Sequence, residues 1–219
     1  MIAQKKKPRV VIADGEAVIG AAIGKLIEPE CEVVGIVEDG RALIEAALRL
    51  RPDVIVLEVM LPQLNGVDAA RQLSKLLPQS KLLFLTAQSS PIVAREAFQA
   101  GASAYVLRRS LPSLLSLAIQ AVMNGQQFVC PLMTKDLLAT GENGDQGNDT
   151  KRCLSSLTPR QREVLQLIAE GRGTKEVAMV LNIAVKTVEF HKFRIMEQLN
   201  LHSTAALTRQ AIAEGLVSF

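Results

Sequence analysis

The sequence predicts an α/β domain, a doubly wound five-stranded parallel sheet, followed by a small all-α helix-turn-helix domain. Short β-branched runs alternate with longer segments of helical spacing over residues 1–125. A segment rich in Gly, Asn and Asp, "GENGDQGNDT" at 141–150, ends this alternation, and only helical spacing follows it. With 219 residues and 48% apolar side chains, the chain is long enough for two domains with separate cores.

Five strand–helix pairs account for the first 125 residues. Runs such as "VIVL" are apolar on both faces, as strands of a parallel sheet covered by helices must be. In such a fold, ligands and chemistry lie at the carboxyl ends of the strands. The expected strands are Arg9–Ala13, Glu32–Val37, Val54–Leu57, Lys81–Leu85 and Ala104–Leu107, and the expected helices cover 17–27, 40–50, 66–77, 91–100 and 111–124.

The C-terminal residues predict four helices. Thr158-Pro159 starts the first helix, with Thr as the cap and Pro in the first turn, and Gly171 and Gly173 end it. A short helix, a tight turn and a longer helix then form a helix-turn-helix arrangement. The remaining helices cover 174–181, 185–199 and 203–214. We therefore place the domains at 1–125 and 153–219, with a linker at 126–152.

Composition indicates a cytoplasmic protein without a membrane span. Cys31, Cys130 and Cys153 are dispersed, which is typical of a reducing compartment rather than of a disulfide framework or a zinc site. The N-terminal residues contain no long apolar segment of the kind that a secretory signal needs. Residues 110–134 carry no charge, but their apolar part, Leu111–Met123, is too short to cross a bilayer.

Charge is distributed unevenly along the chain. Residues 1–125 carry 14 basic and 12 acidic side chains, a net charge of +2. Residues 126–150 carry 1 and 4, a net charge of −3, and residues 151–219 carry 10 and 6, a net charge of +4. A nucleic-acid partner would therefore bind at the C-terminal domain.

Helical spacing over 185–199 separates two faces. Val188, Ile195 and Leu199 point towards the core, with His191 at the border, and the opposite face is polar and aromatic. A recognition helix reads base edges in the major groove with its first residues and contacts phosphates with flanking ones. The predicted DNA-binding residues are Lys175, Lys186, Thr187, Glu189, Phe190, His191, Lys192, Phe193 and Arg194.

The individual side chains suggest different roles on DNA. Lys186 suits guanine or a phosphate, Glu189 suits cytosine N4, and Phe190 suits a thymine methyl group. Thr187, Lys192 and Arg194 suit phosphates. The residues alone also allow a plain helical packing unit with a solvated face. They equally allow a protein-interaction module that binds a partner regulator through Phe190 and Phe193.

Residues 157–201, "LTPRQREVLQLIAEGRGTKEVAMVLNIAVKTVEFHKFRIMEQLNL", resemble the LuxR-type helix-turn-helix. The resemblance implies regulation of transcription on double-stranded DNA, usually as a homodimer. The chain departs from common members at Gly173 and at the two phenylalanines, which leaves the operator sequence open. The matching residues are Leu157-Thr158, Arg162-Glu163-Val164-Leu165, Glu170-Gly171, Lys175-Glu176-Val177-Ala178, Lys186-Thr187-Val188, His191 and Leu199.

The segments "RVVIADGE", "RPDVIVLEVMLPQLNG", "LLFLTAQ" and "AGASAYVLRR" resemble a flavodoxin-like response-regulator receiver. With the C-terminal half, the chain resembles a NarL/FixJ-type response regulator of two-component systems. In that family an Asp accepts a phosphoryl group, two adjacent acids bind Mg²⁺, a Lys pairs with the phosphate, and a Thr or Ser reports the change. The corresponding pocket here contains Asp14, Gly15, Glu16, Glu58, Thr86 and Arg108.

Three of these positions depart from the family. Glu58 replaces the acceptor Asp, Gly15 replaces one of the acids, and Arg108 replaces the Lys, while Thr86 matches. Glu carries its carboxylate one methylene further out, and the loss of an acid weakens Mg²⁺ binding, so we expect no cofactor, no metal and no enzymatic activity. Arg suits a permanent carboxylate pair, so we predict an ion pair between Glu58 and Arg108 in a phosphorylation-independent regulator.

Alternatives remain at this stage. The Glu58–Arg108 pair is either a built-in partial phosphomimic or part of an inert pocket. Another alternative is a protein that is still phosphorylatable, with Glu16 returning a carboxylate to the metal site, some other residue as the acceptor, and a sensor kinase as a possible partner.

Overall fold

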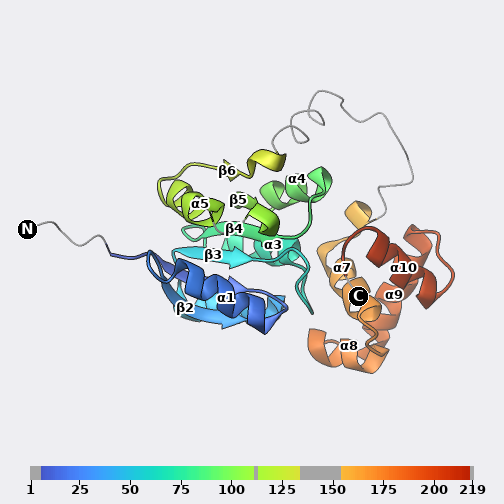
Figure 1. The fold of residues 1–219 in the computed structure, drawn as a ribbon. Coiled ribbons are helices and arrows are strands. Elements are labelled where there is room, and N and C mark those ends of the chain that lie inside the picture. The colour runs from blue at the N-terminus through green and yellow to red at the C-terminus, as the bar shows by residue number, and fades with distance from the viewer. Residues whose placement is uncertain (1–5, 111–112, 134–153, 218–219) are drawn as a thin grey trace, which may run out of the picture. The chain divides into compact units, whose positions relative to one another are not determined.

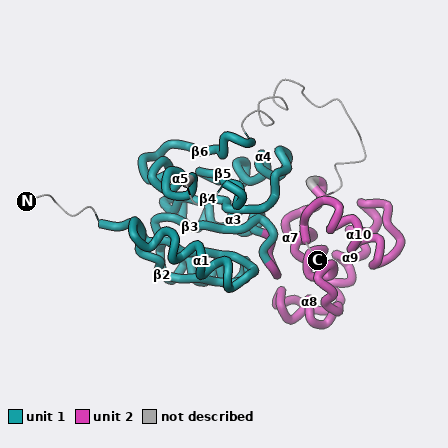
Figure 2. Tube along the Cα trace, in the orientation of Figure 1, with its two compact units in different colours: residues 1–61, 66–144 teal, residues 62–65, 145–219 magenta. Residues whose placement is uncertain are grey.

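The computed structural model describes residues 6–110, 113–133 and 154–217 (Figure 1). The chain divides into two compact units, residues 1–61 with 66–144 and residues 62–65 with 145–219 (Figure 2). Most of the predicted linker, residues 134–152, lies outside the described residues, and so does Cys153.

The first unit is a parallel sheet with helices against it. The strands follow the order β2-β1-β3-β4-β5-β6, so the chain reverses direction across the sheet between β1 and β3. Strands are β1 (Arg9–Ala13), β2 (Glu32–Val37), β3 (Val54–Leu57), β4 (Lys81–Thr86), β5 (Ala102–Leu107) and β6 (Phe128–Val129). Helices are α1 (Ala17–Ile27), α2 (Gly40–Leu50), α3 (Gly66–Leu76), α4 (Pro91–Gln99) and α5 (Ser113–Met123), with a 3₁₀ turn η1 at Arg108–Ser110.

The prediction of five strands is wrong by one. Phe128 and Val129 form a sixth strand, β6, which pairs in parallel with Ala104 and Tyr105 of β5, inside the range predicted as linker. Two residues are too short for a recognisable strand pattern, and polar glutamines precede them. The doubly wound class and the five other strands are confirmed, although β5 begins two residues earlier than predicted.

Helices α1 and α5 share one apolar core with the sheet. Ile23 and Ile27 of α1 and Leu115 and Ile119 of α5 pack with Val56 and other strand residues. Helix α2 packs against β1 and β2, α4 packs against β5, and α3 lies next to both α2 and α4. All four residues of β3 are buried, so Glu58, which follows them, is held at the end of a rigid strand.

The second unit is helical, as predicted. Its elements are η2 (Leu154–Ser156), α7 (Pro159–Ala169), α8 (Thr174–Leu181), α9 (Val185–Gln198) and α10 (Thr204–Ala213). Thr158 caps α7: its side chain accepts from the Gln161 N–H, and its own N–H donates to Gln161 Oε1 at 2.8 Å. Asn182 takes the left-handed conformation, φ 51°, that ends α8 and begins the turn to α9. Across the described ranges, no helix is both long and apolar enough to span a bilayer.

Candidate functional site

Four strand ends deliver side chains to one edge of the sheet. Asp14 follows β1, Glu58 follows β3, Thr86 ends β4 and Arg108 follows β5. Because β1, β3, β4 and β5 are parallel, their carboxyl ends meet at this edge. Asp14 is 2% exposed, Glu58 8% and Thr86 0%, so the group is buried. We call Asp14, Glu58, Thr86 and Arg108 the acidic pocket.

Both carboxylate oxygens of Glu58 have partners in the acidic pocket. Oε1 accepts a hydrogen bond from the Val59 N–H at 2.6 Å and another from the Thr86 hydroxyl. Oε2 pairs with Arg108 Nη2 at 2.8 Å and lies 3.4 Å from the Ala87 nitrogen. The structure therefore brings together the two residues that were predicted to pair, and it holds the carboxylate with neighbouring donors.

Arg108 bridges two carboxylates. Its Nη2 atom contacts Glu58 Oε2 and also Asp14 Oδ2. The other oxygen of Asp14 accepts from the Glu16 N–H at 3.0 Å. The pairing with Asp14 was not predicted from the sequence, because the resemblance places Asp14 at the metal rather than at the basic residue. One guanidinium faces two acids, so the three side chains carry a net charge of −1 when both acids are ionised.

Glu58 titrates abnormally in this setting. Burial raises the pKa of Glu58 above its usual value, and the nearby charge of Asp14 raises it further. The Thr86 hydrogen bond, the Arg108 charge and the Val59 N–H oppose that rise. The net direction is upward, so the protein stabilises a proton on this carboxyl more than water does.

A chain of hydrogen bonds leads from Glu58 to Tyr105. Thr86 Oγ1 accepts from the Gln88 N–H at 3.0 Å, and the Tyr105 hydroxyl donates to the Gln88 carbonyl at 2.8 Å. Tyr105 is fully buried, with its ring stacked on Phe84 at 6.0 Å between centroids. Burial and the Glu58 charge raise the pKa of Tyr105. Sequence reasoning missed Gln88, because only its backbone takes part.

Gly66 is a second residue that sequence reasoning left without a role. A Cβ at this position would lie 2.0 Å from the backbone oxygen of Glu58. The Gly66 N–H donates to the Val59 carbonyl at 2.7 Å. The start of α3 thus approaches the end of β3 so closely that only glycine fits, which fixes the backbone that carries Glu58. A glycine eight residues after the acid was the available signal.

Gly15 and Glu16 lie outside the acidic pocket as side chains. Gly15 has none to contribute, and Glu16 is exposed at the N-terminus of α1. In the contacts described above, Glu16 contributes only its backbone N–H, which donates to Asp14. The structure therefore does not bring its carboxylate to the strand ends.

The two faces of α9 are arranged as predicted. Val188 and Ile195 are fully buried, and His191 is half-buried at the border. The predicted DNA-binding side chains Lys186, Thr187, Glu189, Phe190, Phe193 and Arg194 are exposed, as is Lys175 on α8, while Lys192 is half-buried. We call Lys186, Glu189, Phe190 and Phe193 the outer face of α9.

Neighbouring side chains hold two basic residues of α9. The Arg194 guanidinium lies 5.7 Å from the centre of the Phe190 ring and pairs with Glu197 at 2.9 Å. Lys192 Nζ donates to Thr204 Oγ1 at 2.7 Å. Lys192 and Arg194 are thus positioned by contacts within the helical unit. Arg194 remains exposed to solvent and Lys192 is half-buried.

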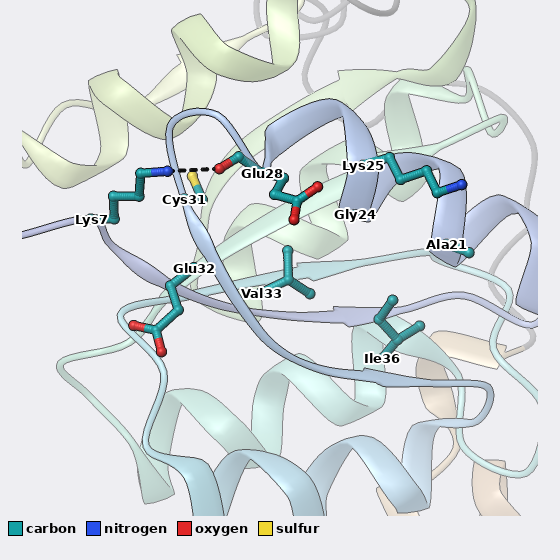
Figure 3. Close-up of a pocket in the computed structure, with 9 residues that line it drawn as sticks. All are labelled: Lys7, Ala21, Gly24, Lys25, Glu28, Cys31, Glu32, Val33 and Ile36. Carbon is teal, nitrogen blue, oxygen red and sulfur yellow. Dashed lines mark hydrogen bonds between the residues drawn. The ribbon is translucent and has the colours of Figure 1, made fainter.

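A hollow of about 550 Å³ lies between α1 and the edge strand β2 (Figure 3). Lys7 and Lys25 lie at its rim with Glu28 and Glu32, and the Lys7 ammonium donates to the Glu28 carbonyl at 2.9 Å. Burial raises the pKa of the Cys31 thiol in this hollow to about 11, with Glu30 adding to the rise and Lys7 opposing it. The thiol is therefore protonated near neutral pH and is a poor nucleophile.

The protein combines a parallel sheet that carries acidic residues at its carboxyl edge with a second unit that contains a helix-turn-helix. This combination defines the class of two-domain regulators. Residues 10–120 match the model "Response regulator receiver domain", and residues 155–211 match "Bacterial regulatory proteins, luxR family". The chain belongs to the response regulators that carry a LuxR-family DNA-binding domain, a family of transcription regulators.

Relatives along the whole chain agree with this assignment. The oxygen regulatory protein NreC of Staphylococcus carnosus (strain TM300) is 32% identical over 219 residues, 96% of this chain and 100% of the relative. NreC of Staphylococcus aureus (strain JH9) is 31% identical over 217 residues, with the same coverage. RcsB from Salmonella enterica serovar Typhimurium, solved bound to promoter rprA with the phosphomimetic BeF₃⁻, is 25% identical with a TM-score of 0.61, covering 94% of this chain and 100% of that one.

The acidic pocket does not fit the Mg²⁺ ion that the receiver family binds. Both Asp14 oxygens already have partners, the second acid position is Gly15, and Glu58 is paired with Arg108. Mg²⁺ requires near-octahedral oxygen ligands, and a guanidinium fixed between the two acids would repel it. Within the described ranges, no cluster of three or more His, Cys, Asp or Glu side chains could hold a metal ion.

Proposed function

We propose that the protein regulates transcription by binding double-stranded DNA through α9, without phosphorylation of its receiver unit. The observation that carries the proposal is the position of Arg108, bridged between Glu58 and Asp14. A phosphoryl group would have to displace an ion pair that is already satisfied. It would also have to do so without the metal that neutralises its charge in this family.

Glu58 supports a fixed, active-like receiver. It supplies about one negative charge, against about 1.5 to 2 for a phosphate. That charge already holds the Thr86 hydroxyl, which in this family answers phosphorylation, and Thr86 is linked through Gln88 to Tyr105. The Glu58–Arg108 pair therefore acts as a partial phosphomimic that keeps the unit in one state.

Charge and exposure favour DNA as the ligand of the helical unit. Lys175, Lys186, Lys192 and Arg194 supply positive groups on α8 and α9, and Glu189 lies among them where it can accept from a cytosine amino group. The match to RcsB, solved on promoter DNA, supports the same use of this domain. Binding should weaken steeply with salt, because phosphate contacts release counterions. Homodimer formation and a cytoplasmic location belong to this proposal, and a sensor kinase is not required.

The test combines phosphorylation with DNA binding. The wild-type protein selects duplexes from a random pool, and its affinity for one selected duplex is measured by fluorescence anisotropy. Incubation with acetyl phosphate and Mg²⁺ should add no phosphoryl mass to the protein, and BeF₃⁻ with Mg²⁺ should leave the affinity unchanged. A variant that restores the family residues, Gly15→Asp with Glu58→Asp and Arg108→Lys, is the positive control for the reagents. Stoichiometric phosphorylation of the wild type would overturn the proposal.

A second measurement separates a phosphomimic from an inert pocket. Glu58→Ala removes the carboxylate that holds Thr86, so dimerisation, followed by sedimentation, and DNA affinity should both fall. Unchanged values would show that regulation does not depend on this charge. Failure to select any duplex would instead favour a protein partner for Phe190 and Phe193.

A further inference from the structure

We propose that Phe190 and Phe193 make α9 a reader of pyrimidine C5-methyl groups in the major groove. Such methyl groups belong to thymine and to 5-methylcytosine. The inference rests on the proposed DNA binding and specifies what the outer face of α9 recognises.

Helical geometry puts the two rings in the middle of the groove-entering face. The four residues of the outer face recur at i, i+3, i+4 and i+7, so they share one side of the helix. Phe190 is 56% exposed and Phe193 64%, while Val188 and Ile195 on the core side are fully buried. The rings therefore do not serve the core of their own unit, and they cover about 10 Å of helix together with Lys186.

Neighbours orient the Phe190 ring before any ligand binds. His191 meets it edge-on, with ring centroids 6.0 Å apart and planes at 62°, and the Arg194 guanidinium lies over it at 5.7 Å. Arg194 is itself held by Glu197. An aromatic surface that is already positioned loses little conformational freedom on binding, which favours specific recognition.

The chemistry of the groove leaves one kind of partner for these rings. A phenyl group has no donor or acceptor, so it cannot distinguish bases by hydrogen bonds, and it gains nothing from a phosphate. The apolar feature that a base edge offers in the major groove is the C5-methyl group of thymine. Cytosine offers the same group only when it is methylated. The polar residues Lys186 and Glu189 lie beside the rings on this face and can set the register.

The test changes the DNA and leaves the protein intact. Each thymine of a duplex selected by the wild-type protein is replaced by uracil, which removes the methyl group and preserves base pairing. At the contacted positions the affinity should fall about fourfold for each methyl group that is no longer buried. In a second arm, each cytosine is replaced by 5-methylcytosine. A higher affinity for the 5-methylcytosine duplex would show that the recognised methyl group belongs to methylated cytosine. A lower affinity for the uracil duplex would show that it belongs to thymine.

Protein variants assign the effect to the two rings. Phe190→Ala with Phe193→Ala should bind the thymine and uracil duplexes equally, and because both side chains are exposed, circular dichroism should show an unchanged fold. Leu76→Ala removes a similarly exposed apolar side chain from α3, at 50% exposure, and should keep the wild-type difference.

Each adverse outcome has its own meaning. Equal affinity of the wild type for thymine and uracil duplexes, with no response to 5-methylcytosine, would show that α9 does not recognise C5-methyl groups. DNA binding itself would not be affected by that result. A thymine preference that persists in the double variant would overturn the assignment to Phe190 and Phe193. Failure of the wild type to select any duplex would overturn the proposed DNA binding, and the recognition of C5-methyl groups with it.

Discussion

The acidic pocket and the outer face of α9 use their charges in opposite ways. In the pocket, Asp14 and Glu58 are buried, and both pair with the half-buried Arg108. On the helix, Lys186 and Glu189 are exposed to solvent. Both regions lie where their folds present functional residues, at the carboxyl edge of a parallel sheet and on a helix of a helix-turn-helix.

The difference shows how a site can keep its place in the fold and change its use. A charged side chain that is already paired with its neighbours binds a ligand weakly, because the ligand must first break that ion pair. The pocket therefore contributes to the stability and conformation of its own unit. The helix face contributes little to folding and is available to a partner. Substitutions in the pocket should change stability and, through the conformation of the unit, dimerisation and DNA affinity, whereas those on the outer face of α9 should change DNA binding alone.

The largest effect should come from Arg108→Ala, which leaves two buried carboxylates without their shared cation. We expect a loss of about 3 kcal/mol in the free energy of unfolding at pH 7. The loss should shrink as the pH falls, because the pKa of Glu58 is raised and a protonated Glu58 no longer needs the cation. The chain has one tyrosine and no tryptophan, so fluorescence of the buried Tyr105 during urea unfolding reports on this unit.

Arg109→Ala is the matched control for this change. Arg109 is the next residue along the same 3₁₀ turn and is exposed, so its removal should alter stability by less than about 0.5 kcal/mol. If both variants unfold like the wild type, then Arg108 does not hold the acidic pocket together.

Gly66→Ala tests the backbone beneath the pocket. The added Cβ would approach the Glu58 carbonyl oxygen to 2.0 Å, so the start of α3 or the end of β3 must shift. We expect a loss of about 2 kcal/mol, followed by the same tyrosine signal. Gly24→Ala, on α1 of the same unit, serves as a comparison for chain entropy, because neither glycine has a positive φ and a Cβ at Gly24 would meet no atom nearer than 3.4 Å. A loss at Gly66 no larger than that at Gly24 would show that the close approach is unimportant.

Most of the fold could be predicted from the sequence because its signals are strong and local. Runs such as Val54–Leu57 are buried on both sides, and their apolar pattern reports that directly. The capped start of α7 at Thr158 is equally local. Strand β6 was missed because two residues carry no periodicity, and its place depends on pairing with β5.

The pocket was only partly predictable. The resemblance to the receiver family was enough to expect the Glu58–Arg108 pair. It was not enough to expect Asp14 on the same guanidinium, since that depends on side-chain reach across three strands. The role of Gln88 lies in its backbone, which residue identity does not report. On α9 helical spacing was enough to separate the two faces, since Val188 and Ile195 are buried while Phe190 and Phe193 are exposed.

Lys186→Ala should weaken DNA binding without touching stability. Lys186 lies in the first turn of α9 and is exposed, so its loss removes one charge-assisted contact, about 1.5 kcal/mol. If that contact is to a phosphate, the slope of log affinity against log salt should fall by about 1, and the loss should be similar on every duplex. Lys25→Ala, on α1, is the control and should leave affinity and slope unchanged. An unaltered affinity for Lys186→Ala would remove this residue from the interface.

The smallest effect should appear in Glu58→Gln, as a change in pH dependence. The pKa of Glu58 is raised in the folded protein, so its contribution to stability is fully present below the unfolded value near 4.5 and is lost as the pH rises through the folded value. Gln does not titrate, and it keeps an oxygen for the Thr86 hydroxyl. Relative to the wild type, Glu58→Gln should therefore gain stability as the pH rises from 4.5 towards 7. Glu16, two residues after Asp14, is exposed, so Glu16→Gln should follow the wild-type curve of unfolding free energy against pH. Parallel curves for all three proteins would mean that burial of Glu58 does not perturb its titration.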